Sequence, residues 1–149
     1  MKHKILAFTL LAVGLSACGT TKVNVAENRA DELKTIQRIC IIPNPKRTPH
    51  GLEQVIARSL QNQGIEAEIV DVAANRQRLY KPECRYNLRY ISAGSPEMIK
   101  KIAMILRTPD YHVANLGYNV NDEPEYRRSP NLQQQTDGII ARLLGKKAQ

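Results

Sequence analysis

The sequence predicts one small α/β domain, in which a β-α-β unit, a tyrosine- and arginine-rich strand and a C-terminal helix pack as a mixed sheet with helices on it. Three observations predict this class. The segment 36–42 is followed by a helical repeat and then by an alternating segment, 65–72. A second alternating segment follows at 84–92, and an apolar helical stripe at 132–144 closes the chain. The 149 residues suffice for a single domain.

The N-terminus has the pattern of a secretory signal peptide. Lys2 and Lys4 precede thirteen uncharged residues, 5–17. This stretch is shorter than the roughly 20 apolar residues that span a bilayer. A basic start followed by about 7 to 15 apolar residues is typical of a signal peptide. The alternative is a buried core helix with an incidental cysteine at position 18, which the N-terminal position and the flanking lysines disfavour.

Cys18 is the predicted attachment point to a membrane. Residues 15–18, Leu-Ser-Ala-Cys, resemble the lipobox of bacterial lipoproteins. The resemblance implies that the thiol takes a diacylglyceryl group, that residues 1–17 are removed and that the new amino terminus is acylated. Several acyl chains, at about 0.8 kcal/mol for each buried methylene, hold a protein to a membrane durably. By resemblance to enterobacterial sorting, Gly19 implies transfer to the outer membrane, with the domain facing the periplasm; an inner-membrane location and exposure at the cell surface are the alternatives.

The mature chain is predicted to begin with a flexible tether. Residues 18–34 are polar and lack a sustained apolar period, so the folded domain is expected to span 35–149. Loss of residues 1–17 leaves 20 Lys and Arg against 14 Asp and Glu, a net charge of +6. This charge favours an anionic envelope surface as a partner, although scattered cations also suit an ordinary solvated surface. Nucleic acid is not an expected partner, because secretion separates the chain from it.

The first half of the domain is predicted to be the β-α-β unit. Residues 36–42 are rich in β-branched side chains and predict a buried strand, which a proline stops. Thr48 and Pro49 predict the start of a helix, and Gly64 is expected just beyond its end. Residues 65–72 alternate as a strand does. Strands joined through a helix in this way are expected to be parallel.

Cys40 and Cys84 are the two cysteines that remain once Cys18 is lipidated. Disulfides persist in an oxidising compartment, so the sequence predicts a bridge between them as a structural staple. Two separate buried thiols are the alternative. Closing a loop of this length, residues 40–84, is worth roughly 4 kcal/mol in the chain-entropy model. The sequence suggests no redox role, because there is no Cys-x-x-Cys and no histidine near either residue.

Residues 84–92 alternate sharply and predict a half-exposed strand. Arg85 and Arg89 fall on its polar face, about 13 Å apart. This pair is a candidate docking patch for a carboxylate-rich envelope protein. The alternative is the ordinary solvated side of a sheet.

The segment 95–120 has two interpretations. Its apolar residues between 98 and 106 fit a helix, yet residues 102–106 and 114–120 also alternate on either side of a turn at 108–110, as a hairpin does. Ser129 and Pro130 predict the start of the last helix, whose apolar stripe should pack on the sheet.

Five segments carry a resemblance to a known family. They are ICIIPNP at 39–45, QNQGIEAEIVD at 61–71, CRYNLRYIS at 84–92, IAMILR at 102–107 and TDGIIARLL at 136–144. This order of segments resembles an uncharacterised family of small bacterial envelope lipoproteins. In that pattern the chain continues after the tyrosine-rich strand as a hairpin and closes with a helix, so the resemblance implies two strands within 95–120. The tryptophan that such relatives carry between these strands is absent here.

The sequence predicts no catalytic residue, metal site or cofactor. His50 and His112 are the histidines of the mature chain, and neither has ligand spacing to a second metal ligand. There is no Gly-x-Ser-x-Gly and no glycine-rich phosphate loop. The predicted function is therefore a membrane-anchored, non-catalytic binding or accessory module at the cell envelope. The alternative is an enzyme acting on envelope polymer, with His50 or His112 as base.

Overall fold

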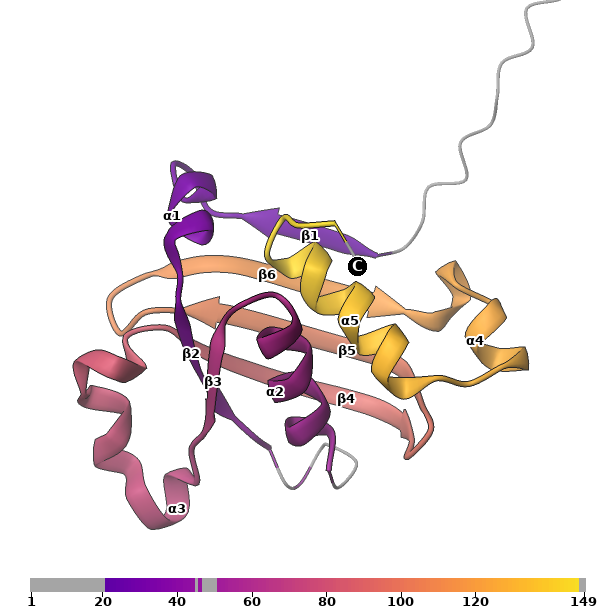
Figure 1. Ribbon diagram of the computed structural model, residues 1–149, viewed down its shortest axis with the longest axis horizontal. Helices are drawn as coiled ribbons and strands as arrows, with labels where there is room; N and C mark the ends of the chain where they lie inside the picture. The colour runs from indigo at the N-terminus through magenta and orange to yellow at the C-terminus, as the bar shows by residue number, and fades with distance from the viewer. Residues whose placement is uncertain (1–20, 45, 47–50, 148–149) are drawn as a thin grey trace, which may run out of the picture.

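Over the residues it describes, 21–44, 46 and 51–147, the computed structural model contains one six-stranded mixed sheet with helices (Figure 1). The strand order is β1-β6-β5-β4-β2-β3. The strands are β1 Lys22–Val25, β2 Arg38–Ile42, β3 Glu66–Ile69, β4 Asn87–Ser95, β5 Met98–Arg107 and β6 His112–Asn119. The helices are α1 Ala30–Thr35, α2 Leu52–Asn62, α3 Val72–Asn75, α4 Glu125–Arg128 and α5 Leu132–Leu143, with short 3-10 turns at η1 Arg76–Tyr80, η2 Pro82–Cys84 and η3 Val120–Asp122. The predicted fold class is confirmed.

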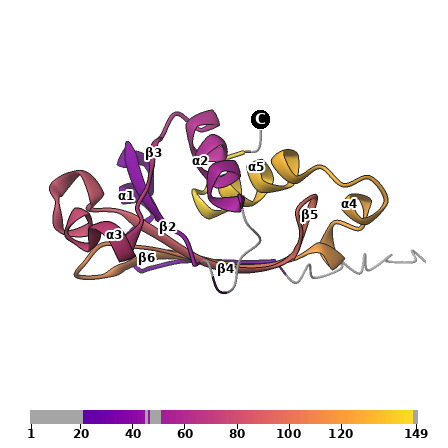
Figure 2. The same ribbon diagram turned by 90° about the horizontal axis from the view of Figure 1, so that it is seen from below.

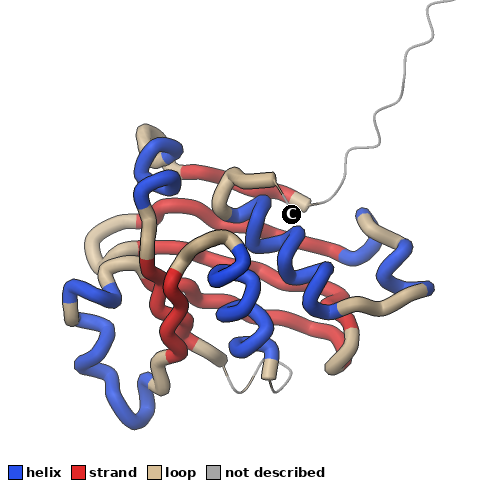
Figure 3. The backbone as a smooth tube through the Cα atoms, viewed as in Figure 1, coloured by secondary structure: helices blue, strands red, loops and turns tan. Residues whose placement is uncertain are grey.

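The two long helices, α2 and α5, lie on the same face of the sheet (Figure 2), and Figure 3 shows them in blue in front of the red strands. They also contact each other. Strand side chains alternate between the two faces, and those that point toward the helices form the core. Ile41, Leu88 and Met104 are almost fully buried there. Removal of this apolar surface from water is the main favourable term in folding.

The predicted β-α-β unit is confirmed. β2 and β3 are parallel, with Ile39 opposite Ala67. The described part of α2 begins at Leu52, whereas the predicted start at residues 48–49 lies outside the described residues. Gly64 has a φ of 77° and donates its N–H to the carbonyl oxygen of Gln61 at 2.9 Å. Glycine adopts this left-handed conformation without the clash of a Cβ, which ends the helix as predicted.

Residues 98–119 form the β-hairpin that the resemblance implied. β5 and β6 are antiparallel, with Met104 opposite Leu116. The turn between them is closed by the Thr108 N–H, which donates to the Tyr111 carbonyl oxygen at 2.8 Å. A helix over this segment would bury only part of the apolar residues that the two strands place on one face.

The predicted flexible tether is wrong over residues 22–34. β1 pairs antiparallel with β6, so Val23 lies opposite Leu116, and α1 buries Leu33 to 3 % exposure. Both side chains of β1 that face the helix side, Val23 and Val25, are more than a third exposed. Backbone pairing with the edge of β6 therefore holds this strand, and pairing leaves no apolar period in the sequence. Residues 1–20, with the predicted signal peptide and the predicted lipidation site Cys18, lie outside the described residues.

The C-terminal helix is fixed to the sheet by a buried glutamine. Gln135 is 1 % exposed, and its side chain both accepts from the Ile99 N–H and donates to the Ile99 carbonyl oxygen, each at 2.8 Å. It also donates to the Tyr118 hydroxyl. The cap of α5 is Asn131, whose side chain accepts from the Gln134 N–H at 3.0 Å, so the predicted start at Ser129 is two residues early.

The predicted disulfide is confirmed. Cys40 on β2 and Cys84 in η2 are bonded, and both are fully buried. The bridge joins the parallel part of the sheet to the chain that enters β4. In the unfolded chain it closes the loop between residues 40 and 84 and so lowers the conformational entropy of that loop, which includes the polar connection through α3, η1 and η2.

Removal of the bridge is expected to lower the free energy of unfolding by about 4 kcal/mol, because the unfolded chain gains the entropy of an open loop. The Cys40→Ser/Cys84→Ser protein, compared with the oxidised protein in urea unfolding, measures this loss. Reductant should destabilise the natural chain and leave the double variant unchanged. Equal unfolding midpoints for the two proteins would contradict a stabilising role of the bridge.

Candidate functional site

The face of the sheet turned away from α2 and α5 is uncovered over β1, β4, β5 and β6 among the described residues (Figure 2). Residues directly opposite one another on paired strands project from the same face. By this rule Ile91, Ala103, Gly117 and Lys22 form one row across four strands. We call this surface the open face. It consists of Lys22, Asn24, Arg89, Ile91, Ala93, Lys101, Ala103, Ile105, Asn115, Gly117 and Asn119.

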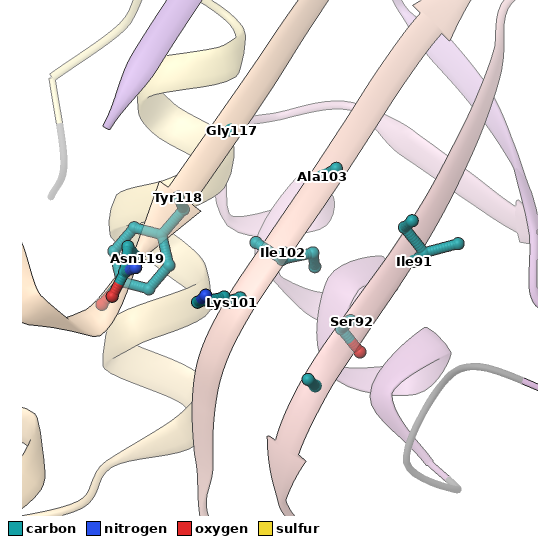
Figure 4. Close-up of a pocket in the computed structure, with 9 residues that line it drawn as sticks. Ile91, Ser92, Lys101, Ile102, Ala103, Gly117, Tyr118 and Asn119 are labelled. Carbon is teal, nitrogen blue, oxygen red and sulfur yellow. The ribbon is translucent and has the colours of Figure 1, made fainter. Parts of the chain in front are cut away.

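Two adjoining hollows lie along the open face. The larger, about 610 Å³, crosses β4, β5 and β6, and the smaller, about 400 Å³, lies toward the end of β2. Ile91 and Ala103 line both of them. Figure 4 shows the larger hollow with the two long helices behind the strands. Its floor is low because Ala103 and Gly117 have no side chain beyond Cβ.

The centre of the open face is apolar. Ile91 and Ile105 are 43 % and 45 % exposed, although both stand in the middle of long strands. Ile91 on β4 is opposite Ala103 on β5, and Ile105 lies two residues beyond Ala103 on β5. The two isoleucines are therefore diagonal neighbours on one face. Single exposed apolar residues are common on protein surfaces, whereas a contiguous apolar patch ringed by polar groups marks a contact surface.

The rim of the open face is cationic. None of the 14 Asp and Glu residues of the chain lies in β1, β4, β5 or β6, whereas Lys22, Arg89 and Lys101 are exposed there. Glu68 projects from the same side of β3, but Arg78 donates to its two oxygens at 2.6 and 2.7 Å. This hydrogen bonding holds the pKa of Glu68 below its usual value and offsets its charge. The open face therefore has a positive potential.

A second polar cluster holds α1 on the domain. The Glu32 carboxylate accepts from the hydroxyls of Tyr86 at 2.7 Å and Tyr111 at 2.6 Å, and from Arg29 at 3.0 Å. Its side chain is only 15 % exposed. Burial by itself raises the pKa of Glu32, but the hydrogen bonds from the two tyrosines and the Arg29 guanidinium outweigh burial and lower that pKa. Charge-assisted hydrogen bonds of this kind are the strong ones in proteins.

The two arginines of the predicted docking patch are separated. β4 begins at Asn87, and Arg85 has helical backbone angles, so the strand alternation does not reach it. Its guanidinium donates to the Tyr111 hydroxyl at 3.2 Å, beside the Glu32 cluster. Arg89 alone lies on the open face. The prediction that both arginines line one strand face is thus wrong, because the η2 turn that carries Cys84 precedes the strand.

The remaining candidate residues lie apart from these clusters. His112 is exposed at the start of β6, opposite Arg107, and His50 lies outside the described residues. Cys40, Glu68 and Cys84 bring possible ligand atoms within 4.8 Å of one another. The two sulfurs are bonded to each other, and the carboxylate accepts hydrogen bonds from Arg78. All three candidate metal ligands therefore already have other partners.

Comparisons with known proteins find distant structural neighbours. Neither the models of known protein families nor the curated proteins match the chain. Solved structures that resemble it include the PelC dodecamer from Paraburkholderia phytofirmans and a single-substitution variant of that protein. Each is 14 % identical, with a TM-score of 0.49, over 88 % of this chain and 99 % of the other. In the described part of the chain, no helix has the length and apolar character needed to span a bilayer.

Replacement of Glu32 by Gln is expected to lower the free energy of unfolding by about 2 kcal/mol at pH 7, because a neutral amide accepts weaker hydrogen bonds. The folded-state pKa lies below the unfolded value of about 4.5, so this contribution is present above that value and is lost as the pH falls through the folded pKa. Urea unfolding of both proteins between pH 7 and pH 3 measures the difference.

The matched control is Asp31→Asn. Asp31 is one residue away, is fully exposed and pairs only with Lys34, so its replacement should leave the unfolding midpoint nearly unchanged. A difference between natural and Glu32→Gln protein that stayed constant down to pH 3 would contradict the assigned role of the carboxylate.

Proposed function

We propose that the protein is a non-catalytic binding module of the bacterial cell envelope, held at the periplasmic side of the outer membrane by lipid on Cys18. The open face is its binding surface. The observation that carries the proposal is the combination on this one surface of exposed isoleucines, two shallow hollows and a rim of cations without carboxylates.

The layout of the open face supports a binding role. Interfaces between proteins and their partners commonly have an apolar centre and a polar rim. Ile91 and Ile105 supply the centre, and Lys22, Arg89 and Lys101 supply the rim. Because the sheet beneath is paired on both sides of β4, β5 and β6, the surface is rigid before a partner arrives, and binding orders little additional chain.

The anchor is tested by Cys18→Ser. Serine has no thiol to form the thioether, so an unprocessed precursor is expected to accumulate and the acylated mature protein to disappear. Mass spectrometry of the N-terminal peptide, together with membrane fractionation, measures both. A Cys18→Ser protein that is still processed to the mature length and remains with the membrane would overturn the anchor.

The binding surface is tested by photo-crosslinking in living cells. A photoreactive amino acid at position 103 stands in the centre of the open face, and the same group at Gln54 stands on the exposed side of α2 as the matched control. We expect discrete adducts, of protein or of lipid, from position 103 and only background from position 54. Equal labelling at the two positions would show that the open face is not a preferred binding surface.

A further inference from the structure

We infer that the open face binds the membrane itself, docking on anionic phospholipid headgroups in the leaflet that holds the Cys18 anchor. This inference rests on the proposed function and names the partner of the same surface. It follows from the length of chain between the anchor and the sheet, from the difference in charge between the two sides of the molecule, and from the apolar centre of the open face.

The chain between the anchor and the sheet is short. Thr21 is already tied to the domain, since its hydroxyl donates to a carboxylate oxygen of Asp122 at 2.6 Å. Lys22 then begins β1, the edge strand of the sheet. Three Cα–Cα steps lead from Cys18 to Thr21, and a fully extended chain covers at most about 3.6 Å per step. Thr21, which directly precedes β1, therefore stays within about 11 Å of the lipidated residue, too close for the domain to stand clear of the headgroups.

The two sides that meet at the β1 edge differ in charge. The helical side carries both signs of charge, with Glu53 and Arg58 on α2 and Asp137 and Arg142 on α5. The open face carries Lys22, Arg89 and Lys101, and the four strands beneath it contain no Asp or Glu. A surface of anionic headgroups attracts cations within about a Debye length and repels carboxylates. Once the edge is held at the membrane, charge favours the orientation with the open face down.

The apolar centre completes the match to a lipid surface. Ile91 and Ile105 stand between the cations, where they reach past the headgroups that the cations bind. The row from Lys22 through Gly117 and Ala103 to Ile91 crosses three strand spacings, roughly 14 Å. Its far end is thus still close to the anchored edge. An amphipathic surface with cations around apolar side chains is the kind that lies at a membrane interface.

The test uses the full acylated protein reconstituted in lipid vesicles. A fluorophore is attached to Ala103→Cys, or to Gln54→Cys as the matched control on the helical side. Because Cys18 carries lipid and Cys40 is bonded to Cys84, the introduced cysteine is the only free thiol. A quencher on the lipid headgroups should reduce emission from position 103, and not from position 54, in vesicles that contain phosphatidylglycerol. In vesicles of phosphatidylcholine alone, or at high salt, this preference should disappear.

A pair of charge variants measures the electrostatic part. Each cation near an anionic surface changes the docking equilibrium about fivefold, so Arg89→Gln/Lys101→Gln should weaken docking by about 25-fold. Arg58→Gln/Arg76→Gln removes the same charge from exposed positions outside the open face and should leave docking unchanged.

The outcomes separate the two proposals. Equal quenching at positions 103 and 54, quenching that does not depend on phosphatidylglycerol, or equal weakening by the two double variants overturns the docking. If position 103 then crosslinks to a protein in cells, the proposed function stands with a protein partner. A mature protein without acyl chains in the mass spectrum overturns the proposed function, and the docking with it.

Discussion

The structure depends on the fact that β4, β5 and β6 are covered on one face only. The two long helices, α2 and α5, both lie on that face, and the alternating side chains of β4, β5 and β6 that point toward them are buried. Backbone hydrogen bonds are satisfied within the sheet whichever face is covered. The core can therefore be complete on the helical side while Ile91 and Ile105 remain in solvent on the other.

Three specific contacts fix parts of the chain that hydrophobic burial alone would not hold in place. Gln135 ties α5 to β5 by bonding both backbone groups of Ile99. The disulfide holds the irregular connection between β3 and β4 against β2. Glu32 holds α1 on the domain by accepting hydrogen bonds from two tyrosine hydroxyls. Each contact is polar or covalent and joins residues far apart in sequence, so each gives specificity to a domain with a single-layer core.

The same arrangement sets what the protein can do. Pairing of β1 with β6 consumes most of the chain that would otherwise act as a spacer after Cys18, and it places Lys22 on the open face. One strand pairing thus shortens the chain between position 18 and the sheet and adds a cation to the open face. Among the described residues, two polar clusters resemble reactive or metal sites, one around Glu32 and one around Cys84. Their side chains instead stabilise the fold through hydrogen bonds and the disulfide.

The sequence by itself determined the elements whose side chains are sorted by burial. The β-branched run of β2, the spacing of α2 and the pairing of Cys40 with Cys84 were all predictable, because burial and the cysteine count leave a pattern in residue type. Only the tertiary structure decided the rest. β1 is held by backbone bonds to β6, and α1 by Glu32, and neither kind of contact leaves a periodic signal. The open face could not be predicted from the sequence for the same reason. It combines residues of four strands, and the register between those strands is decided by their pairing in the folded domain.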